Sequence, residues 1–191
     1  RGAWGADYPK PEAGKQILRE TIRRVDRDVL VVQEIGPMPF LEELRRDLSR
    51  EGLHYSYAVH LEAEDRERHV ALLSKVPPEQ VTKHDDLEFK YFENRIKVKR
   101  GLLEVSIPLS EDRFLKIFGL HLKSRWTDEK RDPNSELRRT REAEACRNRI
   151  VERTIEAGAP LYLVAGDFND HPASAPLRRF YRRGDFEIGA L

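Results

Sequence analysis

The sequence predicts an α/β fold in which two β-sheets stack against each other and helices cover their outer faces. Helical patterns alternate with short apolar runs near both ends of the chain, and several strand patterns follow one another between them. A length of 191 residues is enough for one domain with a hydrophobic core that needs no disulfide bonds. We therefore expect residues 1–191 to form a single domain.

The composition excludes several classes of protein. Lys and Arg number 35 against 34 Asp and Glu, and the resulting net charge of +1 argues against a protein that coats a polyanion. The single cysteine, Cys146, excludes an internal disulfide and a cysteine-based zinc site. No apolar stretch approaches the roughly 20 residues of a membrane span, and residues 1–10 lack the apolar centre of a signal peptide. The cellular compartment and the oligomeric state stay open.

The first half of the chain predicts a loop over residues 1–10, followed by helices and strands. Apolar residues at helical spacing mark one helix after Pro11 and a second before Gly52: Ile17, Leu18, Ile22 and Val25, then Phe40, Leu41, Leu44 and Leu48. The apolar run Val29–Val32 predicts a strand buried on both faces. Further strands are expected over Tyr55–Val59 and Val70–Leu73, with a polar connection between them.

The second half begins with residues 79–97, which are polar with scattered aromatic side chains and predict no clear element. Leu102–Ile107 and Phe114–Leu122 predict two strands of a hairpin. A polar loop over residues 125–135 precedes a helix that ends at Gly158 and carries one apolar stripe: Leu137, Ala143, Cys146, Ile150 and Ile155. Leu161–Ala165 predicts a last buried strand.

Three of these strands end in polar residues that can carry chemistry. Glu34 follows the first strand, His121 ends the second strand of the hairpin, and Asp167 and Asn169 follow the last strand. If the sheets stack, these ends meet in one cleft. Glu34 can bind Mg²⁺ through oxygen, and Asp167 can orient or deprotonate a water or bind the metal. His121 and Asn169 can donate hydrogen bonds to a phosphoryl group that gains charge.

Each of these residues also has a simpler interpretation. Glu34 can cap the helix that follows it, and His121 can be a core histidine with satisfied hydrogen bonds. The Gly-Asp-x-Asn segment is an ordinary turn sequence, since Asp and Asn favour turns. The strand-then-polar pattern, repeated three times, favours the functional interpretation.

Five segments in this order resemble the endonuclease/exonuclease/phosphatase superfamily, which includes pancreatic-type deoxyribonucleases. They are V-L-V-V-Q-E (Val29–Glu34), H-V-A-L-L-S (His69–Ser74), R-G-L-L-E-V (Arg100–Val105), F-G-L-H-L-K-S (Phe118–Ser124) and G-D-F-N-D (Gly166–Asp170). The resemblance covers about residues 11–175. It implies a deoxyribonuclease-like, four-layered α/β sandwich and metal-dependent cleavage of phosphoesters, usually with Mg²⁺ or Mn²⁺.

The resemblance also implies a role for each candidate residue. Glu34 matches the glutamate that binds the metal, and His121 matches the histidine that contacts the scissile phosphate. Asp167 matches the aspartate that activates the water or assists the leaving group, and Asn169 matches its phosphate-orienting partner. Two departures matter: the family's first strand, which carries an Asn, and its final Asp-His motif have no match in these residues. We therefore expect a sandwich incomplete at both ends, with weak or no activity by itself.

The leading hypothesis is a metal-dependent phosphoester hydrolase, either a phosphodiesterase or a phosphomonoesterase. As a phosphodiesterase it would act on DNA, as an endonuclease or exonuclease, or on a lipid or small phosphodiester. The alternative is a non-catalytic module that keeps the fold and binds a phosphorylated ligand or a partner. A third possibility is an incomplete fold whose open sheet edges favour association. Glu34→Ala and Asp167→Asn separate the first two, since they abolish catalysis but spare the affinity of a binding module.

Overall fold

The computed structural model describes residues 10–159, 161–183 and 186–187, so the loop predicted over residues 1–10 lies outside the described residues except for its last position. The elements, in chain order, are α1 (Glu12–Val25), β1 (Val29–Ile35), α2 (Met38–Arg50), β2 (Tyr57–Leu61), β3 (His69–Ser74), β4 (Gln80–His84), β5 (Glu88–Tyr91), β6 (Asn94–Lys97), β7 (Leu102–Ser110), β8 (Arg113–His121), α3 (Glu136–Arg153), β9 (Tyr162–Asp167), α4 (Ala175–Tyr181), β10 (Arg182–Arg183) and β11 (Phe186–Glu187).

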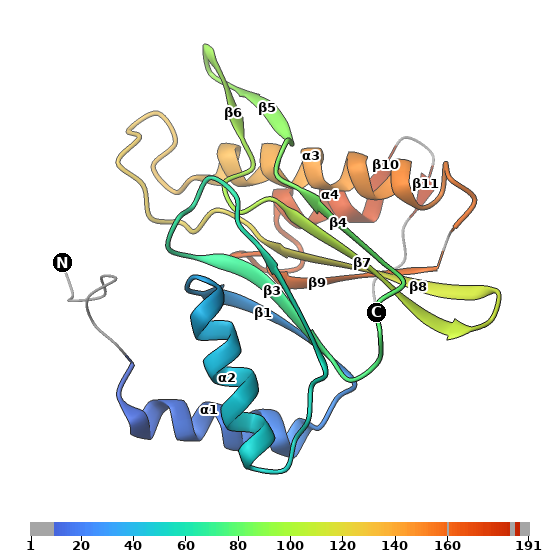
Figure 1. Ribbon diagram of the computed structural model, residues 1–191. Helices are drawn as coiled ribbons and strands as arrows, with labels where there is room; N and C mark the ends of the chain where they lie inside the picture. The colour runs from blue at the N-terminus through green and yellow to red at the C-terminus, as the bar shows by residue number, and fades with distance from the viewer. Residues whose placement is uncertain (1–9, 160, 184–185, 188–191) are drawn as a thin grey trace.

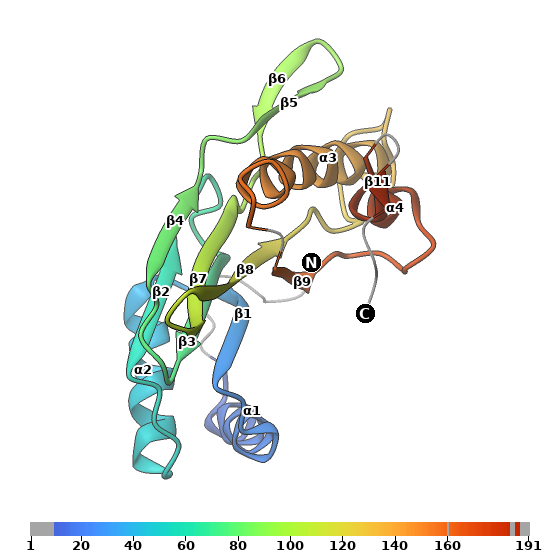
Figure 2. The same ribbon diagram turned by 90° about the vertical axis from the view of Figure 1, so that its right-hand side faces the viewer.

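Two sheets form the centre of the molecule (Figure 1). The first has the strand order β1-β3-β2 and is antiparallel throughout. The second has the order β4-β7-β8-β9 and is antiparallel except for the parallel pair of β8 and β9. Figure 2 shows the sheets edge-on, with α1 and α2 outside the first sheet and α3 and α4 outside the second. The hairpin of β5 and β6 projects beyond both sheets.

The alternation of side chains along the strands builds three separate apolar interfaces. On β3, Leu72 packs between the two sheets, whereas its neighbour Leu73 packs towards α1 and α2. On β8, Ile117 packs between the sheets and Phe118 packs towards α3. Three interfaces hold four layers together, and the predicted four-layered α/β sandwich is confirmed.

Two strands that the sequence predicts to be buried lie at sheet edges instead. Among the described strands, β1 pairs only with β3, and β9 pairs only with β8. The run Val29–Val32 is therefore half-buried rather than buried on both faces. In the segment Leu161–Ala165, Leu161 and Leu163 are 40% and 36% exposed. The apolar composition correctly predicts a strand in both segments, but it does not reveal whether a neighbouring strand lies on each side.

The first predicted helix is confirmed as α1, but most of its apolar residues do not enter the core. Ile22 is buried, whereas Ile17, Leu18 and Val25 are exposed. Arg19 is buried in their place, and its guanidinium pairs with carboxylates of α1 and of the turn after α2. The helical spacing of these apolar residues thus predicts the helix, but it does not predict which of its faces packs against the rest of the protein.

Residues 79–97, for which no element was predicted, contain the strands β4, β5 and β6. The signal was weak because these strands are short, and β4 and β5 each bury only one side chain, His84 and Phe89. The predicted hairpin is confirmed as β7 and β8, and Cys146 is buried in the core as expected. The third helix ends at Arg153, so Ile155 lies beyond it. In the described part of the chain, no helix has the length and apolar character needed to cross a bilayer.

Candidate active site

The ends of β1, β8 and β9 meet at one edge of the interface between the two stacked sheets. The Nε2 atom of His121 lies 3.9 Å from Oε1 of Glu34 and 3.9 Å from Oδ2 of Asp167. Glu34 comes from the first sheet, whereas His121 and Asp167 come from the second. The imidazole is 2% exposed, and the two carboxylates are 64% and 53% exposed. The structure therefore places a buried imidazole beneath two solvent-accessible carboxylates.

The backbone is left-handed at two of the predicted site residues. Glu34 has a φ of 56° and sits where the register of β1 and β3 shifts between Gln33 and Ile35. Asn169 has a φ of 54°. Asparagine adopts this left-handed conformation readily, whereas glutamate rarely does, so the strain lies at Glu34. The helix-cap interpretation of Glu34 is wrong, because α2 begins after Pro37 and has no side-chain cap.

The parallel pairing of β8 and β9 sets the separation of His121 and Asp167. The two residues are register partners, one step beyond the pairing of Leu120 with Gly166. Gly166 has a φ of 150°, and a Cβ atom there would lie 1.9 Å from the carbonyl oxygen of Leu120. Only glycine fits at this close approach, which explains the glycine that precedes Asp167.

Asn169 is held on both sides by the neighbouring strand ends. Its backbone N–H donates to Oδ1 of Asp167 at 2.8 Å, so the predicted turn is present. Its Nδ2 donates to the carbonyl oxygen of Leu122 at 2.8 Å. The amide therefore lies against the chain that leaves β8, next to the carboxylate of Asp167.

The environment of His121 favours its neutral form. Burial lowers the pKa of the imidazole, the charge of Arg100 lowers it further, and the carboxylates of Asp167 and Glu34 oppose this shift. The Nδ1 atom is buried and has no hydrogen-bond partner among the described residues. His121 is thus buried but not a satisfied core histidine, in contrast to His60, whose Nε2 bonds to the carbonyl oxygen of Gly36 at 3.0 Å.

Two basic residues that no sequence pattern marks, Arg100 and Lys123, lie near the candidate site. Arg100 is buried, donates from Nε to Asp65 at 3.1 Å, and donates from Nη1 to the carbonyl oxygen of Leu122 at 3.3 Å. Lys123 follows on the same segment, and burial, together with the charges of Arg138 and Arg100, lowers its pKa to about 8. The one available signal was position, since Arg100 and Lys123 both lie in segments that resemble the superfamily.

The comparison with protein families agrees with this geometry. The model of the endonuclease/exonuclease/phosphatase family matches residues 3–187. The chain belongs to this family. No curated protein sequence matches the chain.

Solved structures share the fold of this family member at low sequence identity. The human Nocturnin catalytic domain with bound sulfate matches with a TM-score of 0.68 and 19% identity, over 94% of this chain and 65% of that one. A beta toxin mutant from Staphylococcus aureus with bound magnesium ions matches with a TM-score of 0.63 and 14% identity, over 87% and 60%. Sphingomyelinase C from Streptomyces griseocarneus matches with a TM-score of 0.57 and 16% identity, over 87% and 61%. The chain spans less than two thirds of the length of each of these structures.

The donor set of this family member fits a hard divalent cation. In the described residues, no cluster of three or more His, Cys, Asp or Glu side chains is arranged to hold a metal. Mg²⁺ usually needs only one or two carboxylates, because it keeps several of its waters. Glu34 and Asp167 provide two accessible carboxylates on either side of one imidazole nitrogen.

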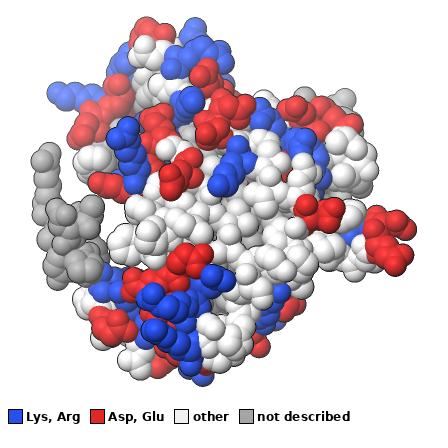
Figure 3. All heavy atoms as spheres, in the orientation of Figure 1, with Lys and Arg blue, Asp and Glu red and all other residues white. Residues whose placement is uncertain are grey.

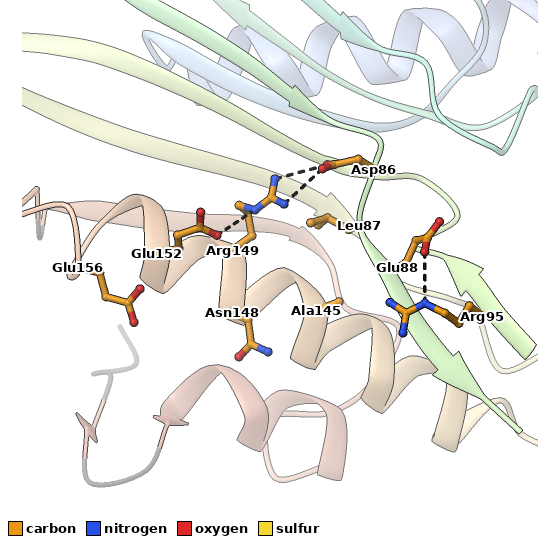
Figure 4. Close-up of a pocket in the computed structure, with 9 residues that line it drawn as sticks. All are labelled: Asp86, Leu87, Glu88, Arg95, Ala145, Asn148, Arg149, Glu152 and Glu156. Atoms are coloured by element: carbon orange, nitrogen blue, oxygen red, sulfur yellow. Dashed lines mark hydrogen bonds and ion pairs between the residues drawn. The ribbon is translucent and has the colours of Figure 1, made fainter.

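Charges of both signs lie on the face of the molecule drawn in Figure 3. On the face drawn in Figure 3, basic and acidic side chains are interspersed among the described residues, with an uncharged band between them. A groove of about 480 Å³ lies between α3 and the segment around β5 (Figure 4). Its Arg149 pairs with Asp86, and its Arg95 pairs with Glu88. None of the four predicted site residues lines this groove.

Proposed function

We propose that the protein is a metal-dependent phosphoester hydrolase that uses Mg²⁺ or Mn²⁺. Glu34 serves as the metal ligand, and His121, Asp167 and Asn169 are the catalytic residues. The observation that carries this proposal is the convergence of Glu34 and Asp167 on the same nitrogen of His121, each at 3.9 Å. Family membership supports the same conclusion.

The chemistry is the attack of a water oxygen on phosphorus with cleavage of one P–O ester bond. The exposed carboxylate of Asp167 orients the water and accepts its proton. The neutral His121 donates from Nε2 to a phosphoryl oxygen, and Asn169 donates its second Nδ2 proton to the same group. The departing oxygen takes a proton from solvent. A divalent cation, when bound by Glu34, supplies positive charge that offsets the negative charge gained by the phosphoryl group.

The substrate in this proposal is a phosphodiester, either DNA or a small molecule. A nuclease that grips DNA relies on many basic contacts to phosphates, and its binding weakens steeply with salt. The net charge of +1 and the mixed surface charges give only weak support to such a groove. A small phosphodiester needs contacts only with the residues at the ends of β1, β8 and β9. The test therefore includes both DNA and a small phosphodiester.

The test is hydrolysis of plasmid DNA and of bis-p-nitrophenyl phosphate by the purified protein, with Mg²⁺ or Mn²⁺ and with EDTA. We expect turnover that is weak but EDTA-sensitive, because the family's final Asp-His motif has no match in these residues. Asp167→Asn and Glu34→Ala should each reduce this turnover by roughly 10²-fold or more. Both carboxylates are exposed, so circular dichroism and thermal unfolding should change little. Turnover that is unaffected by both variants would refute the proposal.

The non-catalytic alternative gives a different result in the same experiment. A binding module would turn over neither substrate. It would nevertheless bind a phosphate ester, measured by calorimetry, with the same affinity in Asp167→Asn as in the unmodified protein.

A further inference from the structure

The buried face of α3 contains a charged residue in the middle of its apolar stripe. Arg139 lies on the same face as Ala143 and Cys146, which are fully buried. The Arg139 side chain is only 2% exposed. A guanidinium removed from water is unfavourable unless its donors are satisfied, so the partners of Arg139 show what the structure gains from it.

The first partner is the carboxylate of Asp170. Arg139 donates to Oδ2 of Asp170 from Nε at 3.0 Å and from Nη2 at 2.7 Å. Asp170 is itself 8% exposed, and its Oδ1 accepts from Nη2 of Arg125 at 3.0 Å and from the N–H of His171 at 3.0 Å. The carboxylate that follows Asn169 is therefore fully engaged in hydrogen bonds to protein groups.

The remaining guanidinium nitrogen binds backbone. Nη1 of Arg139 donates to the carbonyl oxygens of Lys123 at 3.2 Å, Asn134 at 3.0 Å and Ser135 at 3.3 Å. One side chain thus joins the segment that leaves β8, the start of α3 and the segment that leaves β9. These contacts add a second, side-chain link between the ends of two strands whose backbones already pair.

The two segments that Arg139 joins are the ones that carry the proposed catalytic groups. Lys123 follows Leu122, whose carbonyl oxygen accepts the Nδ2 of Asn169. Asp170 follows Asn169, whose backbone is in the left-handed conformation. Asparagine tolerates this conformation in a turn, so the position of its side chain is fixed by constraints on the neighbouring residues. The contacts of Arg139 and Asp170 supply that constraint on one side of Asn169.

We propose that Arg139 and Asp170 are positioning residues that hold Asn169 and Asp167 against the end of β8, in register with His121. They touch no reacting atom, and their effect is transmitted through the backbone on both sides of Asn169. This inference rests on the proposed function for its catalytic consequence, although the positioning itself does not depend on turnover.

The experiment compares Asp170→Asn with a matched control, Glu104→Gln. Glu104 is also buried against α3, near its other end, and accepts hydrogen bonds from His84, Lys116 and Arg153. Both variants remove one buried negative charge that faces a guanidinium of the same helix. A purely structural role for Asp170 therefore predicts equal consequences for the two variants.

Two readouts are measured in the full chain. The first, without metal, is the NMR signal and the hydrogen exchange of the backbone and side-chain amides of Asn169. The second is the kcat and KM of phosphodiester hydrolysis. We expect Asp170→Asn to shift the Asn169 signals, speed their exchange and lower kcat by roughly 10- to 100-fold, with little change in KM. Glu104→Gln should lower the unfolding temperature but leave the Asn169 signals and kcat unchanged.

Unchanged Asn169 signals in Asp170→Asn, or equal changes in both variants, would overturn the positioning proposal. Arg139→Lys is measured by the same criteria, because replacing Asp170, the chain neighbour of Asn169, can shift the Asn169 signals whatever its role. Asn169 signals that do not respond to Arg139→Lys would also overturn the proposal. If the unmodified protein hydrolyses nothing but these signals respond to Arg139→Lys and not to Glu104→Gln, the proposed function fails and the positioning pair stands. Lysine retains the positive charge but lacks the planar fork that binds Asp170 and the backbone together.

Discussion

His121 and Asp167 are register partners at the ends of the parallel strands β8 and β9, and their side chains approach to 3.9 Å. The backbone hydrogen bonds of the sheet set this distance, which makes it more precise than a contact between two loops. The arrangement also divides the pair by solvation, with the imidazole buried and the carboxylate accessible. In the proposed mechanism, the buried imidazole donates a hydrogen bond to the same substrate on which the accessible carboxylate acts as base.

The first prediction concerns the protonation of His121. Because burial and the charge of Arg100 lower its pKa, we expect its imidazole to titrate below 6.5 in the metal-free protein, as measured by NMR. Asp167 raises this pKa, so Asp167→Asn should lower the midpoint further. As the pH falls below 6.5, His121 is protonated in the unfolded chain before it is protonated in the folded chain. Its imidazole therefore lowers the free energy of unfolding in that pH range. A midpoint above 6.5 would contradict the structure.

The second prediction concerns the buried carboxylate of Glu104. Burial alone would raise its pKa, but hydrogen bonds from His84, Arg153 and Lys116 lower it to about 2. A carboxylate whose pKa is lower in the folded than in the unfolded chain stabilises the fold when the pH is above the unfolded pKa. This stabilisation is lost as the pH falls towards the folded pKa. We expect this contribution to disappear between about pH 4.5 and pH 2 in urea titrations. Glu104→Gln should lower the free energy of unfolding by about 3–5 kcal/mol at pH 7. It should also weaken the pH dependence of this free energy at acidic pH, and an unchanged pH dependence would refute the assignment.

The third prediction separates backbone strain from steric overlap at two glycines. Gly158 has a φ of 69° with no atom within 4 Å of an added Cβ, whereas a Cβ on Gly166 would overlap the carbonyl oxygen of Leu120. Gly158→Ala should therefore cost only the left-handed strain of about 1–2 kcal/mol. Gly166→Ala should cost about 3 kcal/mol or more, because the strands must move apart. Chemical denaturation measures both, and equal costs would show that β8 and β9 separate easily.

The fourth prediction concerns the reactivity of Lys123. Its lowered pKa of about 8 leaves a substantial neutral fraction at mildly alkaline pH. We expect limiting reductive methylation at pH 8 to label Lys123 before exposed lysines, as followed by peptide mass spectrometry. Arg138 contributes to this lowering, so Arg138→Met should slow the labelling of Lys123. Faster labelling in that variant would contradict the electrostatic origin.

Much of the fold and the proposed site follows from local patterns. The apolar run Val29–Val32 and the hairpin around residues 102–122 were predicted as strands because short β-branched runs bounded by turn residues are a local signal. The strand-then-polar pattern likewise located Glu34, His121 and Asp167. Their roles rest on the proposed chemistry, whereas their proximity is seen in the structure.

The tertiary structure decided which residues are covered and which charges are partnered. The apolar composition of β9 could not reveal that, among the described strands, only β8 pairs with it. The spacing of α1 could not reveal that Arg19 rather than Ile17 is buried. The burial of Arg139 depends on Asp170, a residue far away in the sequence. Periodicity and composition report the secondary structure that each segment prefers by itself. Burial, pKa and positioning depend on partners that only the folded chain brings together.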